Sequence, residues 1–218
     1  MKTDHPMLYR TVSCRTGFAA GQVTAGRLLL CWMLLSVGLG AVLRTVCPAM
    51  PARTLLMQGL QLSDEARTLW DVCRNALCPM LILLSLLILS SASAIGQPFS
   101  LLILFLRGFG IGLAAADALL RLGTGTGLSA AGVLILPFGY CSVLIFVRGA
   151  EAAIPLSSAL TRCLFLGQAG EEIALRRGAL LRMIPVLLLL SVTACGLHTV
   201  LVWLFSDRLL CGILPPEI

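Results

Sequence analysis

The sequence predicts an all-α protein, a polytopic transmembrane helix bundle of about five spans, with a single integral membrane domain over residues 1–218. Of these residues 58% are hydrophobic and only 12% are charged, whereas soluble domains average about 25% charged residues. A soluble core could not bury so much apolar surface, so a lipid bilayer must surround most of the chain. No basic cluster is interleaved with aromatic residues, so we read the net charge of +6 as membrane-loop charge and expect no nucleic-acid binding.

The first span is predicted at 28–47 and the loop after it at 48–76. No small-x-small cleavage site follows the first apolar run, so we expect an uncleaved span in which Arg44 reaches the interface by snorkelling. Within the loop, "SDEARTLWDVCRNA" predicts a short amphipathic helix capped by Ser63. Trp70 on this helix fits two roles, a docking contact for a partner or an anchor at the headgroup boundary.

The uncharged run at 75–106 is too long for one span of about 20 residues, and "SSASAIGQPFS" supplies a break within it. The later spans are predicted at 77–95, 99–120, 130–148 and 183–206. A glycine-rich turn, "RLGTGTGLSA", separates the third span from the fourth, and a polar loop follows at 149–182. A sixth short or re-entrant helix within 151–168 is the alternative.

Five spans place the two termini on opposite sides of the membrane. An N-terminus in the cytoplasm puts the larger share of the basic residues inside, so we expect loop 149–182 to be cytoplasmic, with loop 48–76 and the C-terminus outside. Cys47, Cys73 and Cys78 border the outside loop, where a disulfide is an alternative to unpaired thiols.

Charged residues inside the predicted spans are the main candidates for function. An arginine at the centre of a helix, as Arg107 is, costs about 2.5–3.5 kcal/mol to insert, so we expect it to face the bundle interior with carbonyls or a carboxylate as partner. Gly108 and Gly112 form a GxxxG motif that lets another helix approach closely. Asp117 lies about 15 Å further along the same helix, so Glu151 is another candidate partner for Arg107. A packing role and a role at a partner interface or pathway both remain open for Arg107.

Two consecutive stretches carry a family resemblance. "LFLRGFGIGLAAADALL" and then "GVLILPFGYCSVLIFVRGAEAA" resemble the stage II sporulation protein M family over about residues 99–153. The matching positions are Arg107, Gly108, Gly112, Leu136, Pro137, Gly139, Gly149, Ala150 and Glu151.

This resemblance implies a bacterial membrane protein of the mother cell that takes part in engulfment of the forespore. It further implies a non-catalytic scaffold that recruits and positions two peptidoglycan hydrolases, stage II sporulation proteins D and P. Under this hypothesis the outside loop and the span faces hold the partners, and self-association remains open.

Other chemistries find weaker support in the sequence. "GTGTG" lacks the lysine of a phosphate-binding loop, and Cys195 with His198 are only two ligands, so we expect no cofactor, no metal and no catalytic residue. The serine of "GLSA" at 127–130 with His198 would suit an intramembrane serine protease. A small permease subunit is the stronger alternative, with Arg107 and Asp117 along a pathway and "GEEIALRRGALLR" as a coupling helix.

Overall fold

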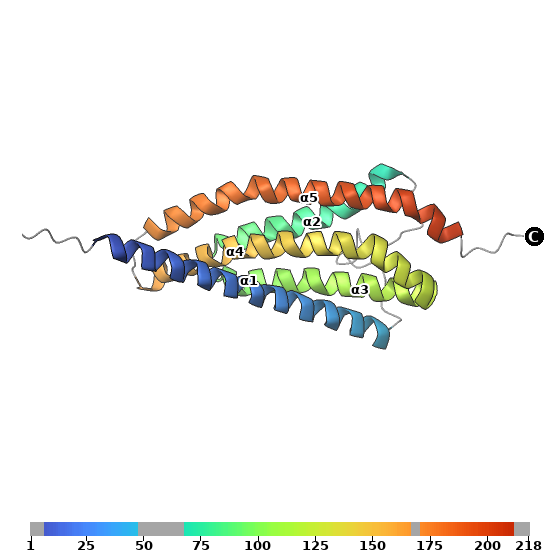
Figure 1. Cartoon of the computed structure of the whole chain (residues 1–218), viewed down its shortest axis with the longest axis horizontal. Helices are drawn as coiled ribbons and strands as arrows, with labels where there is room; N and C mark the ends of the chain where they lie inside the picture. The colour runs from blue at the N-terminus through green and yellow to red at the C-terminus, as the bar shows by residue number, and fades with distance from the viewer. Residues whose placement is uncertain (1–6, 48–67, 167–170, 212–218) are drawn as a thin grey trace, which may run out of the picture.

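The computed structural model describes residues 7–47, 68–166 and 171–211, and within these ranges it contains helices and no β-strand. The elements are α1 (Met7–Val46), α2 (Leu69–Ser91), α3 (Gly96–Ala130), a π-helical turn η1 (Ala131–Ile135), α4 (Leu136–Leu166) and α5 (Glu171–Cys211) (Figure 1). In the part of the chain that the structure describes, five helices are long and apolar enough to cross a membrane. The predicted all-α bundle of about five spans is therefore confirmed.

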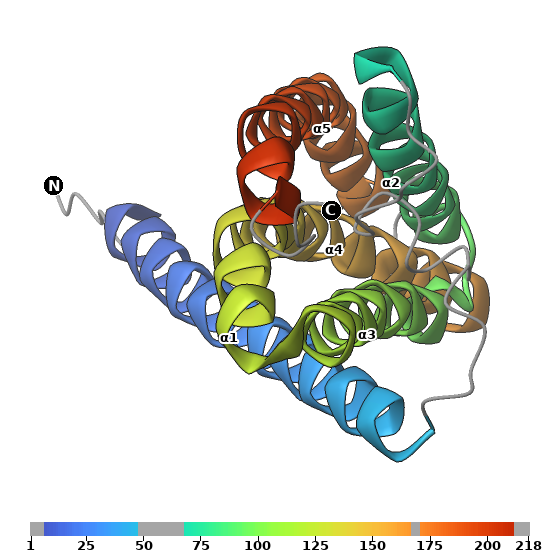
Figure 2. The ribbon, with the colours of Figure 1, turned by 90° about the vertical axis from the view of Figure 1, so that its right-hand side faces the viewer.

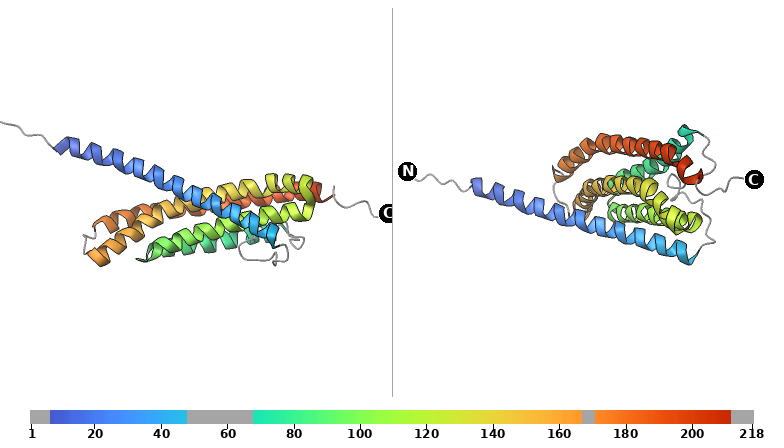
Figure 3. Two further views of the ribbon diagram at one scale, coloured as in Figure 1. Left: turned by 90° about the horizontal axis from the view of Figure 1, so that it is seen from below. Right: turned by 45° about the vertical axis from the view of Figure 1, so that its right-hand side comes forward.

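Helices α3 and α4 form the centre of the bundle. Of the residues in their most apolar windows, 61% and 59% are buried, against 28% in each of the other three spans. Helix α1 packs chiefly on α3, while α2 and α5 pack on α4 and on each other (Figure 2). Helix α1 crosses the others obliquely, and its N-terminal part extends away from them (Figure 3). The two central helices therefore carry the residues that are most remote from lipid.

The break between α2 and α3 falls within the stretch predicted to contain it. The chain turns at 92–95, and side chains from the far end of α4 hold that turn. Ser157 Oγ donates to the Ser93 carbonyl oxygen at 2.7 Å, and Thr161 Oγ1 donates to the Ala94 carbonyl oxygen at 2.5 Å. These hydroxyls bond to carbonyl oxygens of the turn itself and so fix the α2–α3 connection to α4.

The glycine-rich turn after the third span is also confirmed. Gly123 has a φ of 75°, a left-handed conformation that glycine adopts without steric penalty and that interrupts α3. The chain then reverses and enters η1, which ends two residues before Pro137. Proline lacks an N–H and its ring clashes with the carbonyl of the preceding turn, so a locally widened helix is the expected result.

The predicted loop at 149–182 is mostly helical in the structure. Helix α4 continues to Leu166 and α5 already begins at Glu171, so no separate sixth helix forms within 151–166. The polar composition of this stretch suggested a loop, but Ala153, Leu156 and Ala159 face inward and are buried, and this packing keeps the segment helical.

The second span also begins earlier than predicted. Helix α2 starts at Leu69, and Thr68 Oγ1 accepts from the Asp71 N–H at 3.2 Å as its N-cap. The predicted amphipathic segment is therefore the first part of α2 from Leu69 onward. The cap predicted at Ser63 lies outside the described residues.

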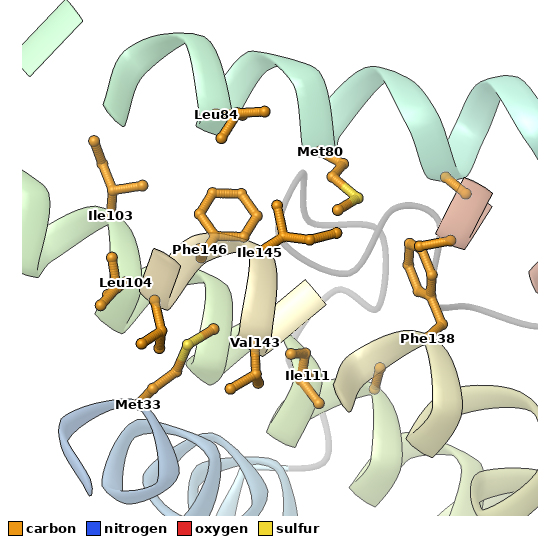
Figure 4. Packing of buried hydrophobic residues seen from close by; sticks show 14 of the residues in the cluster. Met33, Met80, Leu84, Ile103, Leu104, Ile111, Phe138, Val143, Ile145 and Phe146 are labelled. Atoms are coloured by element: carbon orange, nitrogen blue, oxygen red, sulfur yellow. The ribbon is translucent and has the colours of Figure 1, made fainter. Parts of the chain in front are cut away.

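The hydrophobic core is formed where the five described helices meet around α4, and Figure 4 shows part of it. The labelled side chains come from α1, α2, α3 and α4, and they are Met33, Met80, Leu84, Ile103, Leu104, Ile111, Phe138, Val143, Ile145 and Phe146. The same layer holds the buried arginine described next.

Candidate functional site

Arg107 lies inside the bundle between α3 and α4, with only 1% of its surface exposed. Its Nε donates to Ser142 Oγ at 2.6 Å. Its guanidinium carbon is 5.4 Å from the ring centroid of Phe138 and 6.0 Å from that of Phe146, distances at which the faces of aromatic rings attract a cation. The predicted interior position is confirmed, but the partners that the structure shows are a hydroxyl and two aromatic rings rather than a carboxylate.

No described carboxylate is available to neutralise Arg107. The four acidic side chains that the structure describes pair elsewhere: Asp71 with Arg74, Asp117 with Arg44 and Arg121, Glu151 with Arg148, and Glu172 with Arg162 and Arg176. The alternative that Glu151 pairs with Arg107 is therefore wrong. Among the described side chains, Arg107 Nη2 is buried without a hydrogen-bond partner. The centre of the bundle thus carries a positive charge that two aromatic rings stabilise, with no carboxylate among the described side chains beside it.

Asp117 forms a second buried charged site, near the end of α1. Arg44 donates to Asp117 Oδ1 from Nη2 at 2.5 Å and from Nε at 3.1 Å, and Arg121 Nε lies 2.9 Å from Oδ2. The predicted snorkelling of Arg44 is wrong, because its side chain is buried against α3. An arginine near the end of a span can extend to the headgroup layer or pair with a buried carboxylate. In this protein Arg44 pairs with Asp117.

The GxxxG motif brings α1 and α3 into backbone contact, which confirms the predicted close approach of a helix. A Cβ on Gly112 would meet the Val37 carbonyl oxygen, and it would lie 2.9 Å from the Ala41 nitrogen. A Cβ on Gly108 would lie 2.7 Å from the Met33 carbonyl oxygen. Arg107 itself points to α4, whereas the two glycines face α1.

Gly40 of α1 completes this contact, and the sequence analysis missed it. A Cβ there would meet the Phe109 backbone, with the Phe109 Cα at 3.1 Å. Ser36 and Gly40 are spaced like Gly108 and Gly112, so a small-xxx-small search of the first span would have found the opposing face.

Pro137 and Gly139 lie next to the arginine site on α4 and have structural roles. A Cβ on Gly139 would lie 3.2 Å from Ile111 Cγ2, so this glycine permits close packing of α4 on α3. In the widened turn before Pro137, the Leu134 carbonyl oxygen is 3.2 Å from His198 Nδ1. A carbonyl oxygen only accepts, so His198 Nδ1 carries the proton in this contact.

Cys195 and His198 are buried packing residues, as expected. The His198 ring stacks on Phe138 with centroids 4.5 Å apart, and Cys195 Sγ lies 3.8 Å from Met80 Sδ. Ser129 of "GLSA" is exposed and donates to the Gly125 carbonyl oxygen at 3.2 Å. Ser129 thus bonds within α3, and the His198 ring packs against Phe138.

Two other groups singled out in the sequence lie at the surface. Trp70 is 70% exposed in the first turn of α2. Cys47, Cys73 and Cys78 are free thiols in the structure, with Cys47 and Cys78 exposed. In the described ranges, no three His, Cys, Asp or Glu side chains gather as a metal site would require.

Comparison with known proteins gives no further guide to function. No protein-family model, no curated protein and no solved structure matches this chain.

Proposed function

We propose that this chain is a non-catalytic membrane scaffold that recruits and positions peptidoglycan hydrolases during engulfment in endospore formation. The observation that supports a scaffold is that the interior charges are held by contacts between helices. Asp117 joins α3 to α1 through Arg44, and Arg107 joins α3 to α4 through Ser142. Charges fixed in this way give a bundle with one defined helix arrangement, which an anchor requires.

The same contacts weigh against a permease pathway through Arg107 and Asp117. A pathway residue has to exchange its partners as a substrate passes. Asp117 already accepts from two arginines, and Arg107 is enclosed by Ser142 and two rings. The two side chains also interact with different neighbouring helices, so they do not line one continuous route.

The identity of the partners comes from the resemblance to the stage II sporulation protein M family, whose members act with stage II sporulation proteins D and P. The exposed apolar residues at the start of α2 support docking of such a partner there. Leu69 and Trp70 are exposed there, directly after residues 48–67. In the predicted topology this end faces the extracytoplasmic side, where peptidoglycan is located.

Affinity isolation of the tagged full-length protein from sporulating cells, after membrane-permeant crosslinking, tests the proposal. We expect the two hydrolases to be recovered, because the scaffold would hold them at the membrane. Recovery of an ATPase in their place would contradict the scaffold and support the permease subunit.

Trp70→Ala localises the contact, and Trp203→Ala is its matched control. Trp203 is a second exposed tryptophan, 61% exposed, near the end of α5. If the start of α2 docks the hydrolases, Trp70→Ala should lower their recovery and Trp203→Ala should not, at equal membrane abundance. Equal recovery from both variants would show that Trp70 is only a headgroup anchor.

A further inference from the structure

One end of the bundle lies where α1 ends and α2 begins, and the other lies where α4 ends and α5 begins (Figure 1). The described arginines at these two ends differ in how they are neutralised. At the end where α1 stops and α2 starts, Arg44 and Arg121 share Asp117, and Arg74 lies 3.8 Å from Asp71. These arginines have carboxylates of the same chain beside them.

At the opposite end, where α4 stops and α5 starts, cations outnumber their partners. Arg162 and Arg176 share Glu172, at 3.8 Å and 2.6 Å. Arg177 and Arg182 follow on α5, exposed, and they form no ion pair with any residue whose side chain the structure describes. This end therefore presents exposed guanidinium groups that no described carboxylate of the chain neutralises.

Large apolar side chains are exposed beside these arginines. They are Leu164, Phe165, Leu166, Leu175 and Leu181, and Phe165 is 78% exposed. The first three follow Thr161, which bonds to the α2–α3 turn, so they extend past the point where the α2–α3 hairpin ends. Exposed apolar groups next to arginines at the limit of a bundle are typical of a surface that lies in the headgroup layer.

We infer that this end, comprising Arg162, Arg176, Arg177 and Arg182 with the apolar residues beside them, binds anionic phospholipid headgroups. A guanidinium group offers a planar fork of donors that matches phosphate oxygens, and it stays charged at any pH of the cell. Phe165 and Leu175 then lie at the boundary with the acyl chains. The site follows from the surface itself and holds for either orientation in the membrane.

Native mass spectrometry of the purified full-length protein in detergent tests this site. The protein is titrated with phosphatidylglycerol or with phosphatidylcholine of the same acyl chains, and bound lipids are counted. We expect phosphatidylglycerol to be preferred, and Arg177→Gln with Arg182→Gln to lower that preference by about fivefold for each arginine removed, equivalent to ~1 kcal/mol each.

Two further double variants distinguish an effect of this lipid site from an effect of net charge and from a disturbance of the fold. Arg74→Gln with Arg121→Gln removes the same charge at the other end and should leave the preference unchanged. Arg177→Lys with Arg182→Lys keeps the charge and should retain most of the preference for phosphatidylglycerol. Equal binding of the two lipids by the unaltered protein, as expected if an acidic protein or a second copy covers this surface, would overturn the inference. So would an equal loss in the Arg74 and Arg121 variant.

Discussion

Adding one methyl group at Gly112 should push α1 away from α3. In Gly112→Ala the new Cβ meets the Val37 carbonyl oxygen and lies 2.9 Å from the Ala41 nitrogen, whereas ordinary contacts of a Cβ are 3.4–4 Å. Both neighbours are backbone atoms, so no side-chain rotation relieves the overlap and the helices must separate. Overpacking of this kind costs about 1–3 kcal/mol, and alanine regains up to ~1 kcal/mol of helix propensity. The net loss of unfolding free energy is then about 0–2 kcal/mol, and relative to a variant that gains only the helix propensity it is about 1–3 kcal/mol.

Reversible unfolding of the purified protein in mixed micelles measures this loss, and Gly38→Ala is the matched control. Gly38 lies on α1, it is exposed, and a Cβ there would have no atom within 4 Å. The control variant should be neutral or slightly more stable than the unaltered protein, because only the helix propensity changes. The reasoning is refuted if the two variants have the same unfolding free energy, since the α1–α3 contact would then tolerate the added methyl group.

Four further outcomes are expected. Arg107→Leu should insert and accumulate normally, because it removes a buried cation with no described carboxylate partner, yet it should fail to complement engulfment. Arg107→Lys should complement partially, and full complementation by the leucine variant would show that the arginine is dispensable. Arg44→Leu should lower the unfolding free energy by about 3 kcal/mol, the lower end of the range for a broken buried pair, because Arg121 still neutralises Asp117. Ser63→Cys, in a background without native cysteines, should react with a membrane-impermeant maleimide in intact cells; labelling only after lysis would reverse the topology.

The existence and approximate positions of the spans could be predicted from the sequence because lipid imposes long uncharged runs. Gly123 as a turn former and Gly108 and Gly112 as a close-packing motif were also recognisable, since each follows from the absence of a Cβ. Such features depend on residues that are near one another in the chain.

The partners of the interior charges could not be predicted in the same way. Arg44 and Asp117 are 73 residues apart, and near the end of a span snorkelling offers an arginine an equally good local solution. Arg107 satisfies Nε with Ser142, one of many serines that sequence alone does not distinguish. The continuation of α4 to Leu166 likewise depends on burial against neighbouring helices, which overrides a polar composition.

The order in which the interior contacts become available follows from the order of synthesis. Arg44 is made before Asp117, and Arg107 is made 35 residues before Ser142. The first helix therefore enters the bilayer before the carboxylate of Asp117 has been made, and headgroups can solvate Arg44 near the end of that helix until the third helix arrives. Arg107 lies near the middle of its span, where headgroups cannot solvate its guanidinium group. A nascent chain that stops after α3 carries this charge toward lipid, and only the emergence of α4 supplies the hydroxyl and rings that enclose it. The fourth helix thus completes the insertion of the third, and we expect the two to leave the insertion machinery as a pair.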